Sequence, residues 1–333
     1  MTVGEILEGL GRLNALVVGD VCLDRWCTYD PAFTEPSRET GLSRVAVVRT
    51  ELTAGAGGTV ANNLAALGVG HVSILGLFGN DGHGFELKQA LSAIGVDLTL
   101  MVNSGKRPTF TYTKLINSRT GEEDQGRVDF VCPDDVPAPL EEELLEHLRS
   151  SASDFDVILV SDQAETDSGA VITPAMRALL ADIAARDQKR VVWVDSRLRI
   201  EHFRGMILKP NEREAREACE RIFGPGVYDL GRLRAHVEAP LVITTCGGDR
   251  VEIAAPGSPV ETIPTRKIEN PVDICGAGDS FSAGAATAYA LSRDARAAAV
   301  FGDLVASVTI MKKGTGTATP HEILAAASRR GIT

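Results

Sequence analysis

The most informative stretch of this 333-residue chain reads Asp273-Ile274-Cys275-Gly276-Ala277-Gly278-Asp279-Ser280-Phe281 and runs into the small-residue segment 282–291. Small residues at 276–278 let backbone N–H groups face outward where a helix begins, and such a helix start is a ready anion site. Asp279 falls in the first turn, where a carboxylate can take a proton from an attacking hydroxyl. The local residues favour this reading no more than a ligand-free helix entry in which Asp279 only faces the helix dipole.

Short apolar runs alternate with helix-like segments along most of the chain. The expected buried strands cover 15–20, 72–77, 157–160, 191–194 and 241–244, and the expected helices cover 59–67, 85–94, 141–149, 173–186 and 211–222. This alternation predicts an α/β fold with a mainly parallel central sheet and helices on both faces. Ligands of such folds gather beyond the carboxyl ends of the strands.

Two segments have a different pattern of polar and apolar residues. Residues 44–52 and 109–116 alternate polar and β-branched side chains, as half-exposed strands do. We expect them to form a small β-sheet lid, inserted from about 27–53 and 107–130. Because no internal repeat or low-complexity linker is evident, we expect a single domain over 1–333.

The composition is that of an ordinary globular protein, with 44% hydrophobic and 24% charged residues and a net charge of −11. It excludes a disordered chain, a fibrous chain and a disulfide scaffold. The acidic balance argues against nucleic-acid or acidic-membrane partners. Ten acids and one base lie between Gly121 and Glu146, so one segment carries most of the charge.

The six cysteines form no CxxC pair and no zinc-site spacing. Reduced thiols and the lack of an N-terminal signal pattern predict a cytoplasmic protein. The segment 52–80 contains no acid, Lys or Arg, which by length alone suggests a membrane span. Its seven glycines and its asparagines indicate a buried strand–helix–strand instead.

Three further patterns have both a ligand-binding and a plain structural interpretation. The glycines at 55, 57 and 58 either bring the backbone close to a polar ligand or make a tight strand-to-helix turn. Asp20 and Asp24 follow the first strand, where a carboxylate either accepts hydrogen bonds from a ligand or caps a turn. Asn211 and Glu214 share one helix face, as metal-supporting oxygens or as an ordinary capping box.

The stretch 273–281 resembles the D-x-x-G-A-G-D-S/T-F signature of the ribokinase-like (PfkB-type) carbohydrate kinases. The resemblance implies a ribokinase-like three-layer fold and phosphoryl transfer from ATP to a sugar hydroxyl. Carried over, Asp279 is the catalytic base, and the amides of Gly276, Ala277 and Gly278 form the anion hole for the transferred group.

The family resemblance also implies a sugar site. The stretch from Gly55 to Gly68 is similar to the N-terminal signature of the family, although Thr59 stands where relatives usually have a sugar-contacting Asn. The implied substrate-binding residues are Asp24, Asp20, Gly55, Gly57, Gly58, Thr59, Asn63 and Lys114. Lys114, together with Arg38 or Arg107, is a candidate for holding a phosphate already on the sugar.

On the nucleotide side, the resemblance implies that Asn211 and Glu214 support Mg²⁺ through water, with K⁺ as a further candidate cofactor. The implied nucleotide-binding residues are Asp195, Arg197, Asn211, Thr245, Gly247, Lys313 and Gly314. The match at 245–250 is partial, because Arg250 stands where the family has a second glycine. Asp303 stands where many relatives have Asn, next to the nucleotide base.

Several stretches are most similar to the kinase domain of the bacterial heptose-7-phosphate kinase/ADP-heptose synthase enzymes. They include 19–25, 108–114, 125–130, 161–162 and 313–320. This resemblance implies phosphorylation of the anomeric hydroxyl of a heptose 7-phosphate. The chain ends at Thr333, so we expect a stand-alone kinase without a nucleotidyltransferase domain. Lids of this family often pair, which predicts a homodimer through the lid.

Other functions remain open at this point. A simple hexose, pentose or nucleoside could be the acceptor on the same fold. A non-catalytic sugar- or nucleotide-binding regulator would keep Asp24 and the glycines but need no base such as Asp279. A Rossmann-type dehydrogenase is disfavoured because no G-x-G-x-x-G follows the first strand.

Overall fold

The structure is a computed structural model that describes residues 1–165 and 171–332. Its central sheet has the strand order β14-β13-β12-β11-β10-β9-β1-β4. The parallel strands are β1 (Asn14–Gly19), β4 (His71–Leu75), β9 (Val157–Asp162), β10 (Val191–Ser196), β11 (Ile207–Leu208) and β12 (Val242–Cys246). The strands β13 (Arg250–Ala254) and β14 (Glu261–Pro264) add an antiparallel edge. The predicted α/β architecture with a mainly parallel sheet is confirmed.

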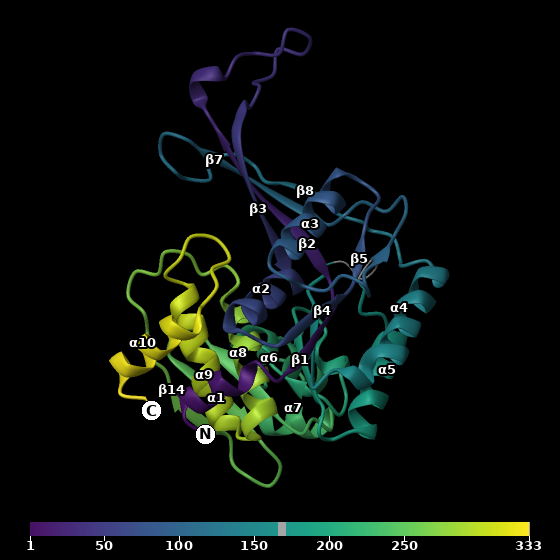
Figure 1. The fold of residues 1–333 in the computed structure, drawn as a ribbon, viewed down its shortest axis with the longest axis vertical. Coiled ribbons are helices and arrows are strands. Elements are labelled where there is room, and N and C mark those ends of the chain that lie inside the picture. Colours follow the sequence, from purple (N-terminus) through teal and green to yellow (C-terminus); the bar gives the residue numbers. More distant parts are fainter. Residues whose placement is uncertain (166–170, 333) are drawn as a thin grey trace.

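Helices cover both faces of this sheet and bury two apolar clusters (Figure 1). One face carries α1 (Val3–Leu10), α2 (Gly57–Leu67), α8 (Ala277–Ser292), α9 (Ala295–Thr309) and α10 (Pro320–Arg330). The other carries α4 (Ala138–Ser151), α5 (Pro174–Arg186), α6 (Glu212–Phe223) and α7 (Leu230–His236). The strands are buried on both faces, which is why they read as unbroken apolar runs rather than alternating ones.

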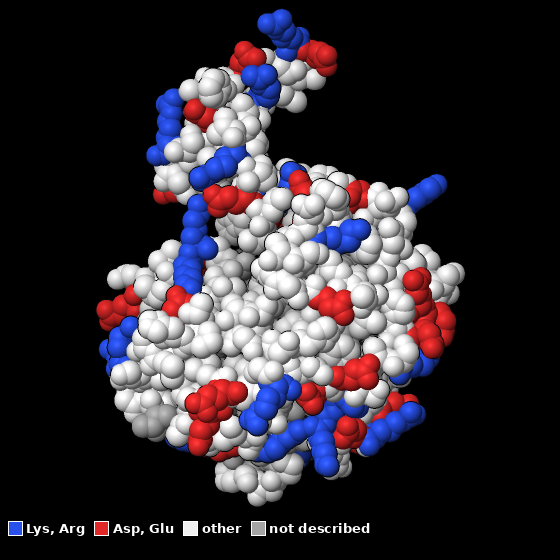
Figure 2. All heavy atoms as spheres, in the orientation of Figure 1, with Lys and Arg blue, Asp and Glu red and all other residues white. Residues whose placement is uncertain are grey.

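A second, four-stranded sheet forms the lid, in the order β3-β2-β7-β8. Its strands are β2 (Val21–Tyr29), β3 (Val47–Ala56), β7 (Thr111–Asn117) and β8 (Val128–Phe130). α3 (Gly82–Ala93) packs against β2 and β3, and the short strands β5 (Leu77–Phe78) and β6 (Val102–Asn103) pair beside it. The segment 30–46, here called the arm, projects from the end of the lid and stands clear of the body (Figures 1 and 2).

The lid contains two strands that the sequence did not predict. β2 contains the turn-like Asp24-Arg25 pair, and β8 spans only three residues. Both depend on pairing with neighbours distant in sequence, since β2 pairs with β3 on one side and with β7 on the other. The lid sheet therefore begins at Val21, directly after β1.

The charge-free segment 52–80 folds as the end of β3, then α2, β4 and β5, as expected from its glycines. No helix within residues 1–165 and 171–332 is long and apolar enough to cross a membrane. All six cysteines lie within these ranges and are free thiols.

Candidate active site

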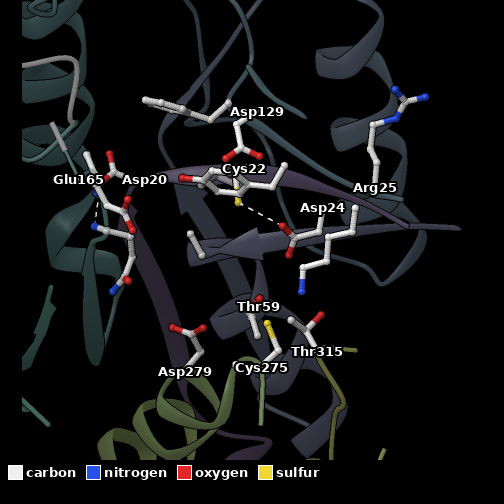
Figure 3. A pocket seen from close by; sticks show the side chains of 18 of the residues that line it. Asp20, Cys22, Asp24, Arg25, Thr59, Asp129, Glu165, Cys275, Asp279 and Thr315 are labelled. Carbon is white, nitrogen blue, oxygen red and sulfur yellow. Dashed lines mark hydrogen bonds between the residues drawn. The ribbon is translucent and has the colours of Figure 1, made fainter. Parts of the chain in front are cut away.

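A cavity of about 310 Å³ lies between the underside of the lid and the carboxyl ends of the central strands (Figure 3). β2, β7 and β8 line it from the lid, and the loops after β9 and β10 and the start of α8 line it from the body. The charged lining residues are Asp20, Asp24, Arg25, Lys114, Arg127, Asp129, Glu165, Arg197 and Asp279. The fold thus brings predicted substrate residues and the predicted base into one enclosure.

The start of α8 forms the floor of this cavity. Gly276 is the N-cap residue, and its left-handed backbone (φ +75°) requires glycine. A Cβ atom there would also stand 3.0 Å from Thr59 Cγ2. Within the described residues, no side chain caps this helix. Of the three predicted anion-hole amides, that of Ala277 donates to the Ile274 carbonyl at 3.2 Å, so Gly276 and Gly278 remain the candidate donors.

Asp279 extends from the first turn of α8 toward the lid (Figure 3). Burial, and then the negative charge of Asp195, raise the pKa of Asp279 to about 7, while Lys209 and Arg197 act in the opposite direction. A carboxyl group whose pKa lies near neutral pH is well matched to accept a proton from a hydroxyl during transfer.

Lys209 is a site residue that the sequence did not single out. Its side chain is 3% exposed, and its ammonium nitrogen lies 2.6 Å from Asp195 Oδ2, which also accepts a hydrogen bond from Ser282 Oγ at 3.1 Å. A Cβ atom at Gly278 would stand 3.2 Å from Lys209 Nζ. A buried cation therefore lies directly beside the helix start that faces the cavity. The available signal was a lysine that directly follows a buried strand.

Asn211 and Glu214 form the capping box of α6. The Asn211 N–H donates to Glu214 Oε2 at 2.8 Å, and the Glu214 N–H donates to Asn211 Oδ1 at 2.9 Å. Burial and the charge of Asp195 raise the pKa of Glu214 to about 7, while Lys209 lowers it. The motif therefore forms the capping box that was one of its two predicted interpretations. Glu214 also lies close enough to Asp195 for their charges to interact.

Asp24 lies on the underside of β2, across the cavity from Asp279 (Figure 3). Cys22 Sγ donates to Asp24 Oδ1 at 3.9 Å, and a Cβ atom at Gly55 would stand only 2.4 Å from Asp24 Oδ2. Glycine at 55 therefore makes room for this carboxylate. Burial raises the pKa of Asp24 to about 6, against the opposing charges of Lys114 and Arg127.

Asp20 also borders the cavity, but its oxygens are already engaged. They accept hydrogen bonds from the backbone N–H groups of Gln163, Ala164 and Val171, each at 2.9 Å. Burial and the charge of Asp162 raise the pKa of Asp20 to about 6. These hydrogen bonds connect the end of β1 to the segment after β9. The geometry therefore favours a structural role for Asp20 over the predicted sugar contact.

The remaining predicted substrate residues divide into two groups. Thr59 lines the cavity at the start of α2, whereas Asn63 is fully buried in α2 and donates to the Thr59 carbonyl at 2.9 Å. Gly57 and Gly58 serve close packing, since Cβ atoms there would stand 3.0 Å from the Asp20 carbonyl and 2.5 Å from Ala54 Cβ. Their role in the structure is to bring α2 against the lid strands.

Two of the predicted nucleotide residues lie close to Asp279. Arg197 lines the same cavity as Asp24 and pairs with Glu165 at 2.5 Å. Asp195 pairs with Lys209 beneath α8. Both therefore belong to the surroundings of Asp279.

The other predicted nucleotide residues belong to loops at the carboxyl edge. Thr245 bridges to Asn211, and Gly247 forms the turn after β12. The Gly314 N–H donates to Asp273 Oδ2 at 3.1 Å, which ties the 312–317 loop, with Lys313, to the segment before α8. A Cβ atom at Gly314 would stand 3.6 Å from Trp26 Cζ2, so this loop also contacts the lid.

A second cavity, of about 930 Å³, lies on the α9–α10 side and was not foreseen. Its lining includes Arg266, Lys267, Lys312, His321, Glu322 and Arg329, with the apolar side chains of Ile268, Val308 and Met311. Gly248 lies against Lys267, so the loop after β12 borders this region. Asp303 lines a smaller neighbouring cavity, and its carboxylate is paired with Arg330 at 2.6 Å.

Comparison with known proteins defines the class. The chain matches the family model for pfkB family carbohydrate kinases over residues 14–322 and belongs to this family. It is therefore a carbohydrate kinase of a family that uses ATP, as the signature at 273–281 implied.

The chain is similar to the bifunctional protein HldE of Geobacter sulfurreducens, with 30% identity over 330 residues. The match covers 97% of this chain and 64% of that protein. HldE of Trichlorobacter lovleyi is also 30% identical, over 98% of this chain and 65% of that protein. The chain thus spans somewhat less than two thirds of the length of these curated relatives.

Solved structures show the same fold. Ribokinase from Thermotoga maritima has a TM-score of 0.69 at 20% identity, covering 95% of this chain and 99% of that one. Phosphofructokinase-2 from Escherichia coli, in complex with potassium, has a TM-score of 0.71 at 16% identity, covering 96% and 99%. The ribokinase-like fold is confirmed.

Proposed function

We propose that this protein transfers the γ-phosphoryl group of ATP to the anomeric hydroxyl of a heptose 7-phosphate. The main supporting observation is the position of Asp279. It lies in the first turn of α8, whose start has no side-chain cap among the described residues, and it faces Asp24 across one cavity. Its pKa is about 7. The similarity to HldE over nearly the whole chain supports a heptose phosphate as the acceptor. The six free thiols agree with the expected cytoplasmic location.

The reaction is an in-line displacement. The acceptor oxygen forms a bond to the γ-phosphorus, the bond from that phosphorus to the β–γ bridging oxygen breaks, and ADP leaves with the electron pair. Asp279 receives the proton of the attacking hydroxyl. The N-terminal amides of α8 and the Lys209 ammonium group stabilise negative charge on the transferred group.

Asp24 is positioned to accept hydrogen bonds from acceptor hydroxyls, since its carboxylate faces the cavity and Gly55 leaves it room. Lys114 lines the same side of the cavity and supplies a cation for the phosphate already on the acceptor. Closure of the lid over both would exclude water and so limit ATP hydrolysis.

Mg²⁺ fits near Glu214. Oε1 of Glu214 takes no part in the capping box, and burial together with the negative charge of Asp195 raises the pKa of the Glu214 carboxyl, so a cation would be favoured there. Mg²⁺ keeps several waters and needs few protein oxygens, so Asn211 and Glu214 would hold it through water. The ion would neutralise charge on the ATP phosphates. K⁺ is a further candidate cofactor, tested by comparing rates in K⁺ and Na⁺ salts.

The second cavity suits the nucleotide. Its cations Arg266, Lys267 and Arg329 could bind the phosphates. The apolar side chains of Val308 and Met311 could pack against the flat base. The segment 266–275 connects it with the start of α8. Substituting Met311 with Asp should raise the KM for ATP while leaving the KM for the sugar unchanged.

The arm offers a surface for a homodimer through the lid. Its exposed apolar side chains are Phe33, Leu42 and Val45, and the adjoining β3 adds Val47 and Val48. Burying these side chains against a second lid would remove them from water. Light scattering of the wild-type protein and of Leu42→Asp tests this, because the proposal requires a wild-type dimer that the substitution weakens.

The acceptor is tested with a panel of heptose 7-phosphate, heptose, fructose 6-phosphate, ribose, fructose and adenosine, with coupled detection of ADP. The proposal expects heptose 7-phosphate to give the highest kcat/KM. If it is inert while a simple hexose, pentose or nucleoside is turned over, the acceptor assignment is wrong and the family assignment stands.

A further inference from the structure

Asp162 is a buried carboxylate that the proposed reaction does not use. It is the last residue of β9, and its side chain is 0% exposed. A charge is kept in the interior of a protein only where hydrogen-bonding partners compensate for the water it has lost. The side chains that do so here, Ser196 and Arg199, come from the end of β10 and the turn that follows it.

Ser196 is the first of these partners. β9 and β10 are parallel neighbours in which Asp162 is in register with Ser196. Ser196 Oγ donates to Asp162 Oδ2 at 2.6 Å and accepts a hydrogen bond from the Arg199 N–H at 3.1 Å. Because the Ser196 side chain is fully buried, water cannot replace either hydrogen bond. One hydroxyl group therefore connects Asp162 to the turn 196–199.

Arg199 is the second partner. Its Nη2 donates to Asp162 Oδ1 at 3.0 Å and to the Ala164 carbonyl at 2.9 Å. The N–H groups of a guanidinium have a fixed geometry, so the carboxylate that orients Arg199 also determines where it meets this carbonyl. The contacts thus lead from the turn after β10 back to the loop after β9.

The two loops held in this way form the body wall of the lid cavity. The lining residues of this wall are Gln163, Ala164, Glu165 and Arg197. The Arg197 N–H donates to the Asp162 carbonyl at 3.0 Å, and the Arg197 side chain pairs with Glu165. Asp162 itself is not a lining residue, so it acts on the cavity only through these loops.

This wall lies close to the reacting groups. The positive charge of Arg197 acts on Asp279, where it opposes the rise of the pKa. Asp20 holds the same wall from β1, because its carboxylate accepts hydrogen bonds from the Gln163 and Ala164 N–H groups (Figure 3). The wall is therefore fixed from two strands, by Asp20 and by Asp162.

We propose that Asp162 is a positioning residue for the acceptor: through Ser196 and Arg199, it holds residues 163–165 and Arg197 where the acceptor meets Asp279. The inference rests on the proposed function, since it takes the lid cavity to be the acceptor site. A displacement of about 1 Å in such a wall is enough to lower the efficiency of a reaction about 100-fold.

The test compares Ser196→Ala with the wild type, because this substitution removes the connecting hydroxyl and keeps both charges of the buried pair. Initial rates are measured with the acceptor that has the highest wild-type kcat/KM in the acceptor panel. The KM for this acceptor should rise about tenfold or more, while the KM for ATP should change less than about twofold. A purely structural role would lower only the amount of folded enzyme, which lowers the apparent kcat and leaves both KM values unchanged.

Ser73→Ala is the matched control. Ser73 lies on β4, is 1% exposed, and its Oγ donates to the carboxylate of Asp97 at 3.2 Å. The control therefore removes the same group and the same kind of hydrogen bond from another strand of the central sheet. Ser73 is not a lining residue of the lid cavity, so both KM values should equal those of the wild type. Thermal unfolding of both variants compares their losses of stability.

Arg199→Lys and Arg199→Met test the same wall from the cation. Lys keeps a positive charge with several N–H donors beside Asp162, whereas Met keeps neither. The acceptor KM should therefore increase from the wild type to Arg199→Lys and further to Arg199→Met. If Arg199→Met does not fold, the comparison of Arg199→Lys with the wild type remains, and an unchanged acceptor KM in Arg199→Lys together with Ser196→Ala overturns the inference.

The outcomes separate the inference from the proposed function. An unchanged acceptor KM in Ser196→Ala, an equal rise of both KM values, or the same rise in Ser73→Ala overturns the positioning role and leaves the proposed acceptor intact. If the best wild-type acceptor is not heptose 7-phosphate, the proposed acceptor is wrong. The positioning role is then decided with the acceptor that the panel identifies.

Discussion

Lys209 Nζ lies 2.6 Å from Asp195 Oδ2, and the same ammonium group stands 3.2 Å from the point where a side chain at Gly278 would begin. The pair sits directly below the start of α8. It therefore brings a positive charge to the place where the transferred phosphoryl group is proposed to bind, and it joins β10 to the segment that follows β11.

Replacing Lys209 with Met should lower both stability and turnover. Removing one partner of a buried ion pair typically costs about 3–5 kcal/mol, because the other charge remains buried alone. The double variant Lys209→Met/Asp195→Asn should regain much of this stability without regaining kcat. Thermal unfolding and initial rates measure the two effects separately, and recovery of kcat in the double variant would contradict the proposed electrostatic role.

Replacing Asp279 with Asn should stabilise the unliganded protein, and more so at high pH. The pKa of Asp279 is about 7 in the folded protein and about 3.9 in an unfolded chain. The folded state thus binds more protons between these values, so its stability falls as the pH rises through this window. Asn cannot ionise, so the gain in Tm should grow from pH 4 to pH 7 and stay constant above. A gain independent of pH would contradict the raised pKa.

Replacing Gly55 with Ala should weaken acceptor binding. The new Cβ atom would lie 2.4 Å from Asp24 Oδ2 and 2.6 Å from Cys22 Sγ, so the Asp24 carboxylate must move. We expect KM for the acceptor to rise about tenfold or more while KM for ATP changes little. Gly82→Ala is a suitable control, since a Cβ atom there meets nothing within 4 Å. Equal effects of both substitutions would argue against the role of Asp24.

Trp26 should report acceptor binding by fluorescence. The chain contains two tryptophans, and Trp193 is fully buried in the core, whereas Trp26 lines the cavity beneath Lys114. A phosphate that draws on Lys114 changes the charge next to the Trp26 ring. Titrating Trp193→Phe with heptose 7-phosphate should give a saturable change, and ATP alone should give a smaller one. A flat titration under conditions of turnover would contradict the placement of the acceptor.

The fold was largely predictable because its signals are local. The buried strands are short apolar runs, and the helices between them end at glycines such as Gly68, which takes the expected left-handed conformation. The motif at 273–281 indicated the family through its resemblance to the D-x-x-G-A-G-D-S/T-F signature, since the local residues alone left a ligand-free helix entry equally open. Asp24 and Asp279 were expected in one active site because each falls in a stretch that resembles a motif of the same family.

The parts that escaped prediction depend on distant pairing. Asp129 comes to lie opposite Tyr112 only through the antiparallel register of β7 and β8, and Arg127 contacts the same Tyr112 ring. Lys209 becomes part of the site because β10 and β11 set it beside Asp195, and Asp20 is engaged by amides more than 140 residues away. Neighbouring residues in the sequence carry no sign of such contacts.

The most direct test follows the reaction by ³¹P NMR with ATP, Mg²⁺ and heptose 7-phosphate, in the wild type and in Asp279→Asn. The wild type should give one new anomeric phosphate for each ADP formed, and the variant should bind both substrates but turn over at least two orders of magnitude more slowly. Full turnover by Asp279→Asn, or a wild type that phosphorylates no sugar or sugar phosphate, would contradict the assignment.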